Sequence, residues 1–256
     1  SRKGASGGRK PAPRQARPGR TKATGGGKLP PGARRGSAPQ KSSTKAQKVV
    51  FDAPADGAGE PRTLRLGAVP GVMPGRWIDT WHDRLPHVRL ELVPIPFATQ
   101  RAALDAGIVD LAVVRAPFDR DGMHAIPLYE ELPVVIASTE SHLLAADELV
   151  PADLDGETLL TCAEDVYGDL DLPAMPSRIP PLATMADAIA TVASGVGIVV
   201  APMSLARLHH RKDVEYRILR GAPVSPVLLA WPIDGQTSDV EAFIGIARGR
   251  TANSSR

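Results

Sequence analysis

Few side chains in this sequence are spaced as the catalytic groups of an enzyme are. The chain contains no Gly-x-Ser-x-Gly turn, no phosphate-binding glycine loop and no His-Glu-x-x-His helix. The adjacent acids Glu130 and Glu131 point to opposite faces of a strand, so they cannot share a proton. A single cysteine, Cys162, excludes a disulfide framework and a multi-cysteine metal site, and is best interpreted as a small buried apolar residue. We therefore expect neither an enzyme nor a bound metal or organic cofactor.

The cationic side chains that could bind phosphate are concentrated near the beginning of the chain. Residues 1–48 contain 14 Lys and Arg and no acid, whereas residues 62–256 contain 17 Lys and Arg against 25 Asp and Glu. Residues 1–61 have too few apolar side chains to form a core, so we expect a disordered basic tail and linker. Lysine and arginine that neutralise phosphates release counterions, which gives binding without sequence readout. The candidate nucleic-acid contacts are Arg9, Lys10, Arg14, Arg17, Arg20, Lys22, Arg34 and Arg35.

Two other interpretations of the tail stay open. Residues 9–11 and 17–20 loosely resemble the Arg-Gly-Arg-Pro core of an AT-hook, with Lys10 in place of one arginine and Pro18 displaced. The tail could also be a solubilising segment that binds nothing.

The rest of the chain carries no signal for a membrane. No apolar run approaches the ~20 residues of a bilayer span, and no apolar segment follows the first basic residues as it would in a secretory signal. We expect a cytoplasmic protein, associated with the nucleoid if its tail binds DNA.

Residues 62–114 alternate between strand and helix patterns. Strands are predicted at 63–69, 88–93 and 108–114, and helices at 75–85 and 99–106. Three strands joined by two helices with short links predict a parallel α/β sheet.

The centre of the second half is residues 184–208. Met185, Ile189, Val192 and Val196 recur at helical spacing, and Thr184 with Asp187 resembles a helix start. The glycines Gly195 and Gly197 end this pattern before a short apolar strand at 198–200 and a second helix at 203–209. Further strands are predicted at 128–137, 158–161, 214–219 and 227–231, and a closing helix at 240–246.

The order of these pieces resembles the effector-binding (substrate-binding) domain of LysR-type transcriptional regulators. The matching stretches are LRLGAV at 64–69, RLPHVRLEL at 84–92, LDAGIVDLAVV at 104–114, EELPVVIASTESHLLA at 130–145, ADLDGETLL at 152–160, ATVASGVGIVVAPMSLA at 190–206 and VEAFIGIA at 240–247. The family also carries a winged helix-turn-helix, but residues 1–61 show no helical pattern in its place.

The resemblance implies an α/β, two-subdomain, periplasmic-binding-protein-like (type 2) fold over residues 62–256. Subdomain one would comprise about 62–139 and 224–256, and subdomain two about 140–223. The family's effector cleft lies between them, and such domains pair side by side. Trp77 and Trp81 lie near the family's pairing surface, so we expect a homodimer.

By resemblance, the cleft would be lined by the residues Pro70, Gly71, Val72, Thr99, Arg115, Thr161 and Gly197. The turn at 70–73 has no hydroxyl, so we expect a more apolar site than in acid-sensing relatives. Arg115 could bind a carboxylate of the ligand through both nitrogens, or it could form a surface ion pair with Asp119 or Asp121.

Together these features favour a non-enzymatic protein of the transcription-regulator type. Its body would bind a small-molecule effector, and its basic tail would hold it near nucleic acid. We expect no membrane partner. The alternative is a cytosolic small-molecule-binding module that acts through protein partners, with a tail that only solubilises it. An enzyme on the same fold is the third possibility.

Overall fold

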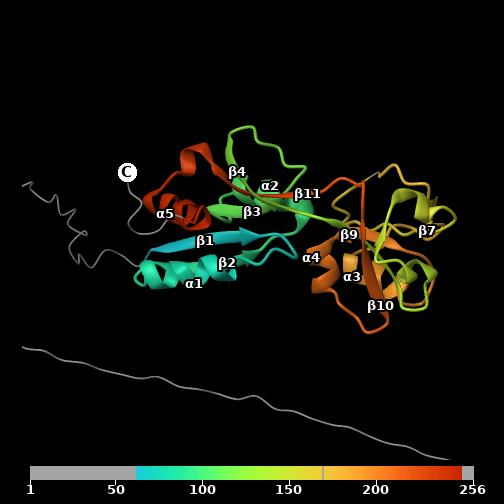
Figure 1. Ribbon diagram of the computed structural model, residues 1–256. Coiled ribbons are helices and arrows are strands. Elements are labelled where there is room, and N and C mark those ends of the chain that lie inside the picture. Colours follow the sequence, from blue (N-terminus) through green and yellow to red (C-terminus); the bar gives the residue numbers. More distant parts are fainter. Residues whose placement is uncertain (1–61, 169, 250–256) are drawn as a thin grey trace, which may run out of the picture. The chain divides into compact units, whose positions relative to one another are not determined.

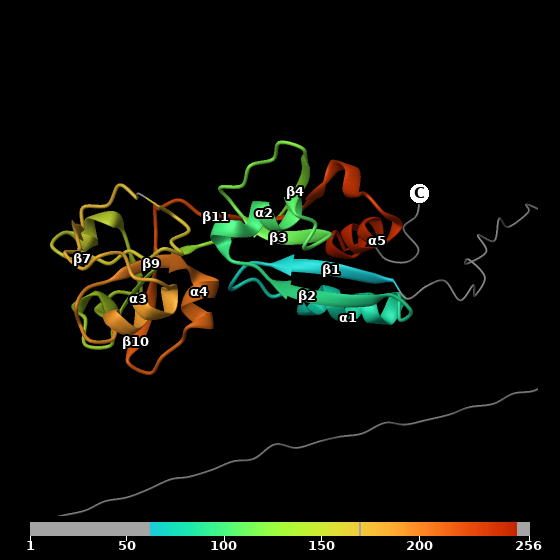
Figure 2. The same cartoon turned by 180° about the vertical axis from the view of Figure 1, so that it is seen from behind.

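The computed structural model describes residues 62–168 and 170–249. The predicted tail contacts, from Arg9 to Arg35, lie outside these residues. The described chain forms two main sheets, each with its own helices, as Figures 1 and 2 show from opposite sides.

The first sheet has the strand order β2-β1-β3-β11-β4. The strands are β1 (Thr63–Ala68), β2 (Arg89–Pro94), β3 (Leu111–Arg115), β4 (Met123–Glu131) and β11 (Ser225–Pro232). The predicted parallel arrangement is confirmed for β1, which pairs in parallel with β2 and β3. The sheet is then completed by β11, which runs antiparallel to both β3 and β4.

Helices cover both faces of the first sheet. α1 (Gly75–Arg84) and α5 (Ser238–Ala247) supply Trp81 and Phe243 to the core on one face. α2 (Gln100–Asp105), which follows the 3-10 turn Phe97–Thr99, contributes Ala103 and Leu104 to the core on the other. Trp81 is fully buried and its Nε1 donates to the Val88 carbonyl oxygen, so it is a core residue and offers no surface to a second copy.

The second sheet has the order β6-β10-β5-β9. The strands are β5 (Pro133–Ser138), β6 (Glu148–Leu149), β9 (Val199–Pro202) and β10 (Val214–Leu219). A small parallel pair, β7 (Thr158–Leu159) with β8 (Met175–Pro176), lies beside it, and 3-10 turns occupy His142–Ala145 and Pro151–Leu154. A further 3-10 turn, Ile233–Gly235, precedes α5.

The helix predicted to begin at Thr184 is α3 (Met185–Val192). The Thr184 hydroxyl accepts from the Asp187 backbone N–H at 3.1 Å, as the start signal predicted. Ile189 and Val192 are buried, as are Ile198 and Val199 around the next strand. Val196, which continues the helical spacing in the sequence, lies beyond the end of α3, and its side chain is exposed. α4 (Met203–Leu208) follows β9 directly.

The chain crosses between the sheets at Leu132 and returns through residues 220–224. The strand region predicted at 128–137 contains parts of two strands, β4 in the first sheet and β5 in the second. The first sheet's share of the chain therefore ends near 131, earlier than the boundary near 139 expected from the family, because β5 pairs with β10 and β9.

Candidate functional site

Two neighbouring cavities lie where the chain crosses between the sheets. The larger has a volume of about 680 Å³, and we call it the crossover groove. It is lined by residues 71–73 after β1, residues 129–132 at the end of β4, and the α4 side chains Met203, Ser204, Arg207 and Leu208. The smaller, the inner cavity, has a volume of only about 10 Å³ and is lined by Val69, Pro70, Phe97, Arg115, Glu164, Val166 and Leu205.

A buried ion pair forms the wall shared by these cavities. The guanidinium of Arg115, at the end of β3, binds both carboxylate oxygens of Glu131, with Nη1 3.0 Å from Oε2 and Nη2 3.3 Å from Oε1. The two side chains are only 1% and 9% exposed. The alternative of a surface ion pair with Asp119 or Asp121 is therefore wrong, and the Arg115 charge is already satisfied by a partner that the sequence did not indicate.

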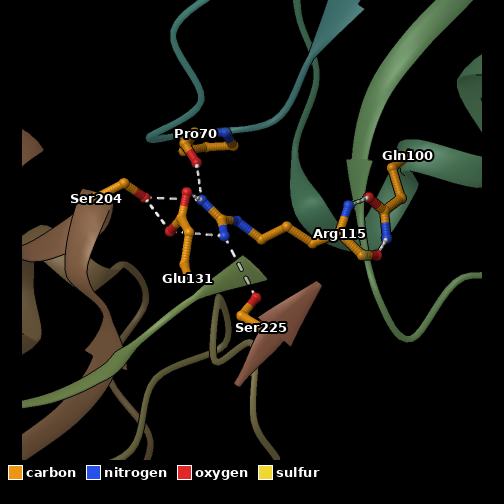
Figure 3. A network of polar contacts seen from close by, with 6 residues as sticks. All are labelled: Pro70, Gln100, Arg115, Glu131, Ser204 and Ser225. Atoms are coloured by element: carbon orange, nitrogen blue, oxygen red, sulfur yellow. Dashed lines mark hydrogen bonds and ion pairs between the residues drawn. The ribbon is translucent and has the colours of Figure 1, made fainter. Parts of the chain in front are cut away.

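Further polar groups surround the pair, as Figure 3 shows. Arg115 also donates to the Ser225 hydroxyl, the Pro70 carbonyl oxygen and the Ser204 hydroxyl. Ser204 in turn donates to Glu131 Oε2 at 2.6 Å. Such a network compensates two charges for the loss of water, which would otherwise make their burial costly.

Gln100 fixes the backbone of Arg115 from the opposite side. Its buried side-chain amide accepts from the Arg115 N–H at 2.9 Å and donates to the Arg115 carbonyl oxygen at 2.8 Å. Gln100, Glu131 and Ser204 are not among the site residues predicted from the sequence. Of these three, only Glu131 could have been predicted. Side chains alternate between the two faces of a strand, so one of two adjacent acids is expected to be buried, and here Glu130 is the exposed one.

The groove is apolar with a few polar groups at its edge. Met73, Tyr129, Leu132 and Leu208 each expose apolar surface into or beside it. Burial raises the pKa of Tyr129, and the nearby Glu131 carboxylate raises it further. Arg207 donates from Nε to the Tyr216 hydroxyl, which raises the pKa of Arg207. Within residues 62–168 and 170–249 Arg207 forms no ion pair.

The structure brings together only part of the predicted ligand site. Gly71 and Val72 line the crossover groove, and Pro70 and Arg115 line the inner cavity. Thr99 and Thr161 are exposed and line neither of the two. Gly197 lies against Thr158, beside a different hollow of about 360 Å³.

Two further features of the described residues concern metal sites and membrane spans. No group of three or more His, Cys, Asp or Glu side chains in this part of the chain is arranged to hold a metal ion. None of its helices is long and apolar enough to cross a bilayer.

Several known proteins are similar to this chain in sequence, and several solved structures are similar to it in fold. CatR, an HTH-type transcriptional regulator of Pseudomonas putida, is 29% identical over 188 residues, which cover 68% of this chain and 64% of CatR. A probable hydrogen peroxide-inducible genes activator of Mycobacterium xenopi is 33% identical over 107 residues, covering 40% of this chain and 56% of that protein. The chain thus spans less than two thirds of the length of these relatives. The curated relatives are transcriptional regulators, not enzymes.

A solved structure of the BenM effector-binding domain with its effector benzoate has a TM-score of 0.61 at 20% identity, covering 75% of this chain and 96% of that one. The oxidised form of OxyR has a TM-score of 0.62 at 20% identity, covering 74% and 94%. These likenesses confirm the two-subdomain, periplasmic-binding-protein-like fold. Residues 57–252 match the LysR substrate binding domain, so this chain belongs to the LysR substrate-binding-domain family.

Proposed function

We propose that the two sheets of this protein bind a small-molecule effector in the crossover groove, as the regulatory part of a LysR-type transcriptional regulator. The observation that carries this is the groove itself, which is lined from both sheets and placed at the chain crossing. Ligand pockets usually measure about 300–1,000 Å³ and are mostly apolar with a few polar groups. The groove fits that description in volume and in lining.

The inner cavity, in contrast, is too small to hold an effector in this conformation. Its volume of about 10 Å³ is close to the space needed by a single water. We therefore place Gly71 and Val72 in contact with the ligand and Pro70 and Arg115 behind it. A role for Thr99, Thr161 and Gly197 stays a prediction.

The chemistry of the groove favours an effector with a largely apolar body. The exposed side chains Met73, Leu132 and Leu208 offer apolar contacts, while the Arg115 charge is compensated by Glu131. BenM, which shares the fold, is known with benzoate as its effector. Because Arg115 is already paired, it is not free to bind a carboxylate, and the effector is expected to be recognised mainly through its apolar part.

A thermal-shift screen of small apolar and carboxylate compounds, followed by calorimetry on the hits, tests this site. Leu208→Arg places a charge in the groove and should weaken binding of a hit about tenfold or more. Ile108→Arg is the matched control, because Ile108 is 53% exposed and Leu208 is 55% exposed, but Ile108 is not among the groove residues. Equal affinities of a hit for both variants would place the effector elsewhere.

We further propose that the basic tail binds nucleic acid without sequence preference and that the protein is a cytoplasmic homodimer. The 14 cations of residues 1–48, which contain no acid, support the first part. The support for the dimer is the side-by-side pairing of the family's effector domains, since Trp81 is buried and does not contribute to it. The alternative, a module that acts through protein partners with an inert tail, makes the same prediction for the groove and the opposite one for DNA binding.

A further inference from the structure

Ser204 forms a polar link between the two halves of the groove. It lies in the first turn of α4, beside the second sheet, whereas Arg115 and Glu131 belong to strands of the first. Its hydroxyl accepts from Arg115 Nη2 at 2.8 Å and donates to Glu131 Oε2 at 2.6 Å (Figure 3). The hydroxyl thus serves as both acceptor and donor between α4 and the first sheet. Hydrogen bonds to charged groups are stronger than those between neutral ones.

The turn after β1 is shaped to admit this hydroxyl. Gly71 has a φ of 85°, which other residues rarely adopt, and a Cβ at this position would lie 2.5 Å from the Ser204 Oγ. The same Cβ would lie 3.2 Å from Arg115 Nη2. A glycine is therefore required both by the backbone and by the close approach of α4.

The position of Ser204 also sets the position of its neighbours. Met203, Arg207 and Leu208 form the α4 wall of the groove, and Met203 N–H donates to the Leu132 carbonyl oxygen at 3.1 Å. The facing walls are residues 71–73 and 129–132. Movement of α4 away from these walls would separate Ser204 from the ion pair and widen the groove.

We propose that Ser204 is a positioning residue: its hydroxyl holds α4 against the Arg115–Glu131 pair and so couples the width of the crossover groove to the closure of one sheet on the other. Its meaning for regulation rests on the proposed function, but the coupling itself does not. The ion pair lies wholly on the first sheet, so we expect it to remain formed when α4 moves away, with water in place of the Ser204 hydroxyl. The cost of opening is thus limited to a small set of contacts, as a switch between two conformations requires.

The test measures the distance between the two halves in the full chain without any ligand. Spin labels are attached to Ala102→Cys on α2 and Ala190→Cys on α3, both exposed alanines outside the groove, and distances are measured by double electron–electron resonance. Cys162 can stay, because burial raises its pKa to about 11 and keeps its thiol protonated. Dilution with unlabelled protein removes distances between copies.

Ser204→Ala is expected to raise the ratio of longer-distance to native-distance molecules roughly tenfold, the size expected for losing hydrogen bonds to charged groups. Ser204→Thr keeps the hydroxyl and should restore the native distribution. Gly71→Ala should reproduce the opening with the hydroxyl intact, because its methyl group meets Ser204.

The matched control is Ser194→Ala. The Ser194 hydroxyl donates to the Thr191 carbonyl oxygen at 2.7 Å, a contact within α3 and its end. An unchanged distribution for Ser204→Ala, or equal changes for the two serine variants, overturns the proposal. Because no ligand is present, this result is independent of the Leu208→Arg experiment, so failure of the coupling and failure of the effector site are distinguishable.

Discussion

At the scale of single residues, Arg115 shows how far sequence can locate a site. Its place at the end of an apolar strand was predictable from the pattern at 108–114. Its partners were not, because Glu131 and Ser204 are 16 and 89 residues away along the chain. Local periodicity reports which face of an element is buried, whereas these contacts depend on how two sheets meet.

Because the Arg115–Glu131 pair is buried, removing one partner should lower the free energy of unfolding by a large amount. Glu131→Gln leaves the Arg115 guanidinium uncompensated in a site that is 1% exposed, so the free energy of unfolding should fall by about 3–5 kcal/mol. Urea unfolding measures it. Arg220→Gln is the control, since the Arg220–Glu148 pair is 56% and 42% exposed and should contribute about 0–1 kcal/mol. Equal losses in the two variants would contradict the account of the pair.

Cys162 predicts a dependence of stability on alkaline pH. Desolvation raises its folded-state pKa to about 11, above the ordinary value of 9.0, so the folded state keeps the proton that the unfolded state loses. The contribution is complete below pH 9 and is lost as the pH rises toward 11, by at most about 2–3 kcal/mol.

Unfolding of the wild type and of Cys162→Ala, measured from pH 8 to pH 11, isolates this contribution. The wild type should lose stability more steeply than the variant, and its thiol should react slowly with a disulfide reagent until urea is added. Rapid labelling of the folded protein at pH 8 would show that the thiol is accessible.

At the scale of elements, the predictions that the structure confirms are those made from local sequence patterns. The start of α3 at Thr184, the alternation of β10 and the helical spacing of α1 were all readable. The division of residues 128–137 into β4 and β5 was not, since a local strand pattern does not reveal that the chain changes sheet at Leu132. The helical spacing continues in the sequence to Val196, but α3 ends at Val192 and the Val196 side chain is exposed, so spacing alone does not locate the end of a helix.

The contrast between Ile198 and Val196 is testable by truncation. Ile198 is 1% exposed among Val135, Leu154 and Val200, so Ile198→Ala should lower the free energy of unfolding by about 2–5 kcal/mol. Val196 is 43% exposed, and Val196→Ala should change it by no more than about 0.5 kcal/mol. Denaturant unfolding of the two variants compares them directly, and a loss below about 0.5 kcal/mol for Ile198→Ala would remove this stretch from the core.

At the scale of the whole molecule, the charge distribution divides the chain into parts of opposite sign. Residues 62–256 have an excess of acids, 25 against 17 Lys and Arg, while residues 1–48 carry 14 cations. This asymmetry was readable from composition alone. The arrangement of the two sheets was readable only through the resemblance to a family, because strand order in space is not encoded in any local pattern.

The same asymmetry predicts that nucleic-acid affinity depends on the tail and varies little with the sequence of the nucleic acid. If about half of the tail's 14 cations meet phosphates, roughly seven counterions are released, and log K should fall with log salt at a slope near −6. The measurement is a salt titration of the full chain on two unrelated duplexes, with a variant in which the tail's Lys and Arg are replaced by Gln as the control. The control should bind weakly with a shallow slope, since the acidic remainder repels phosphates. A strong preference of the wild type for one duplex, or tight binding by the Gln variant, would assign DNA recognition to the folded body instead.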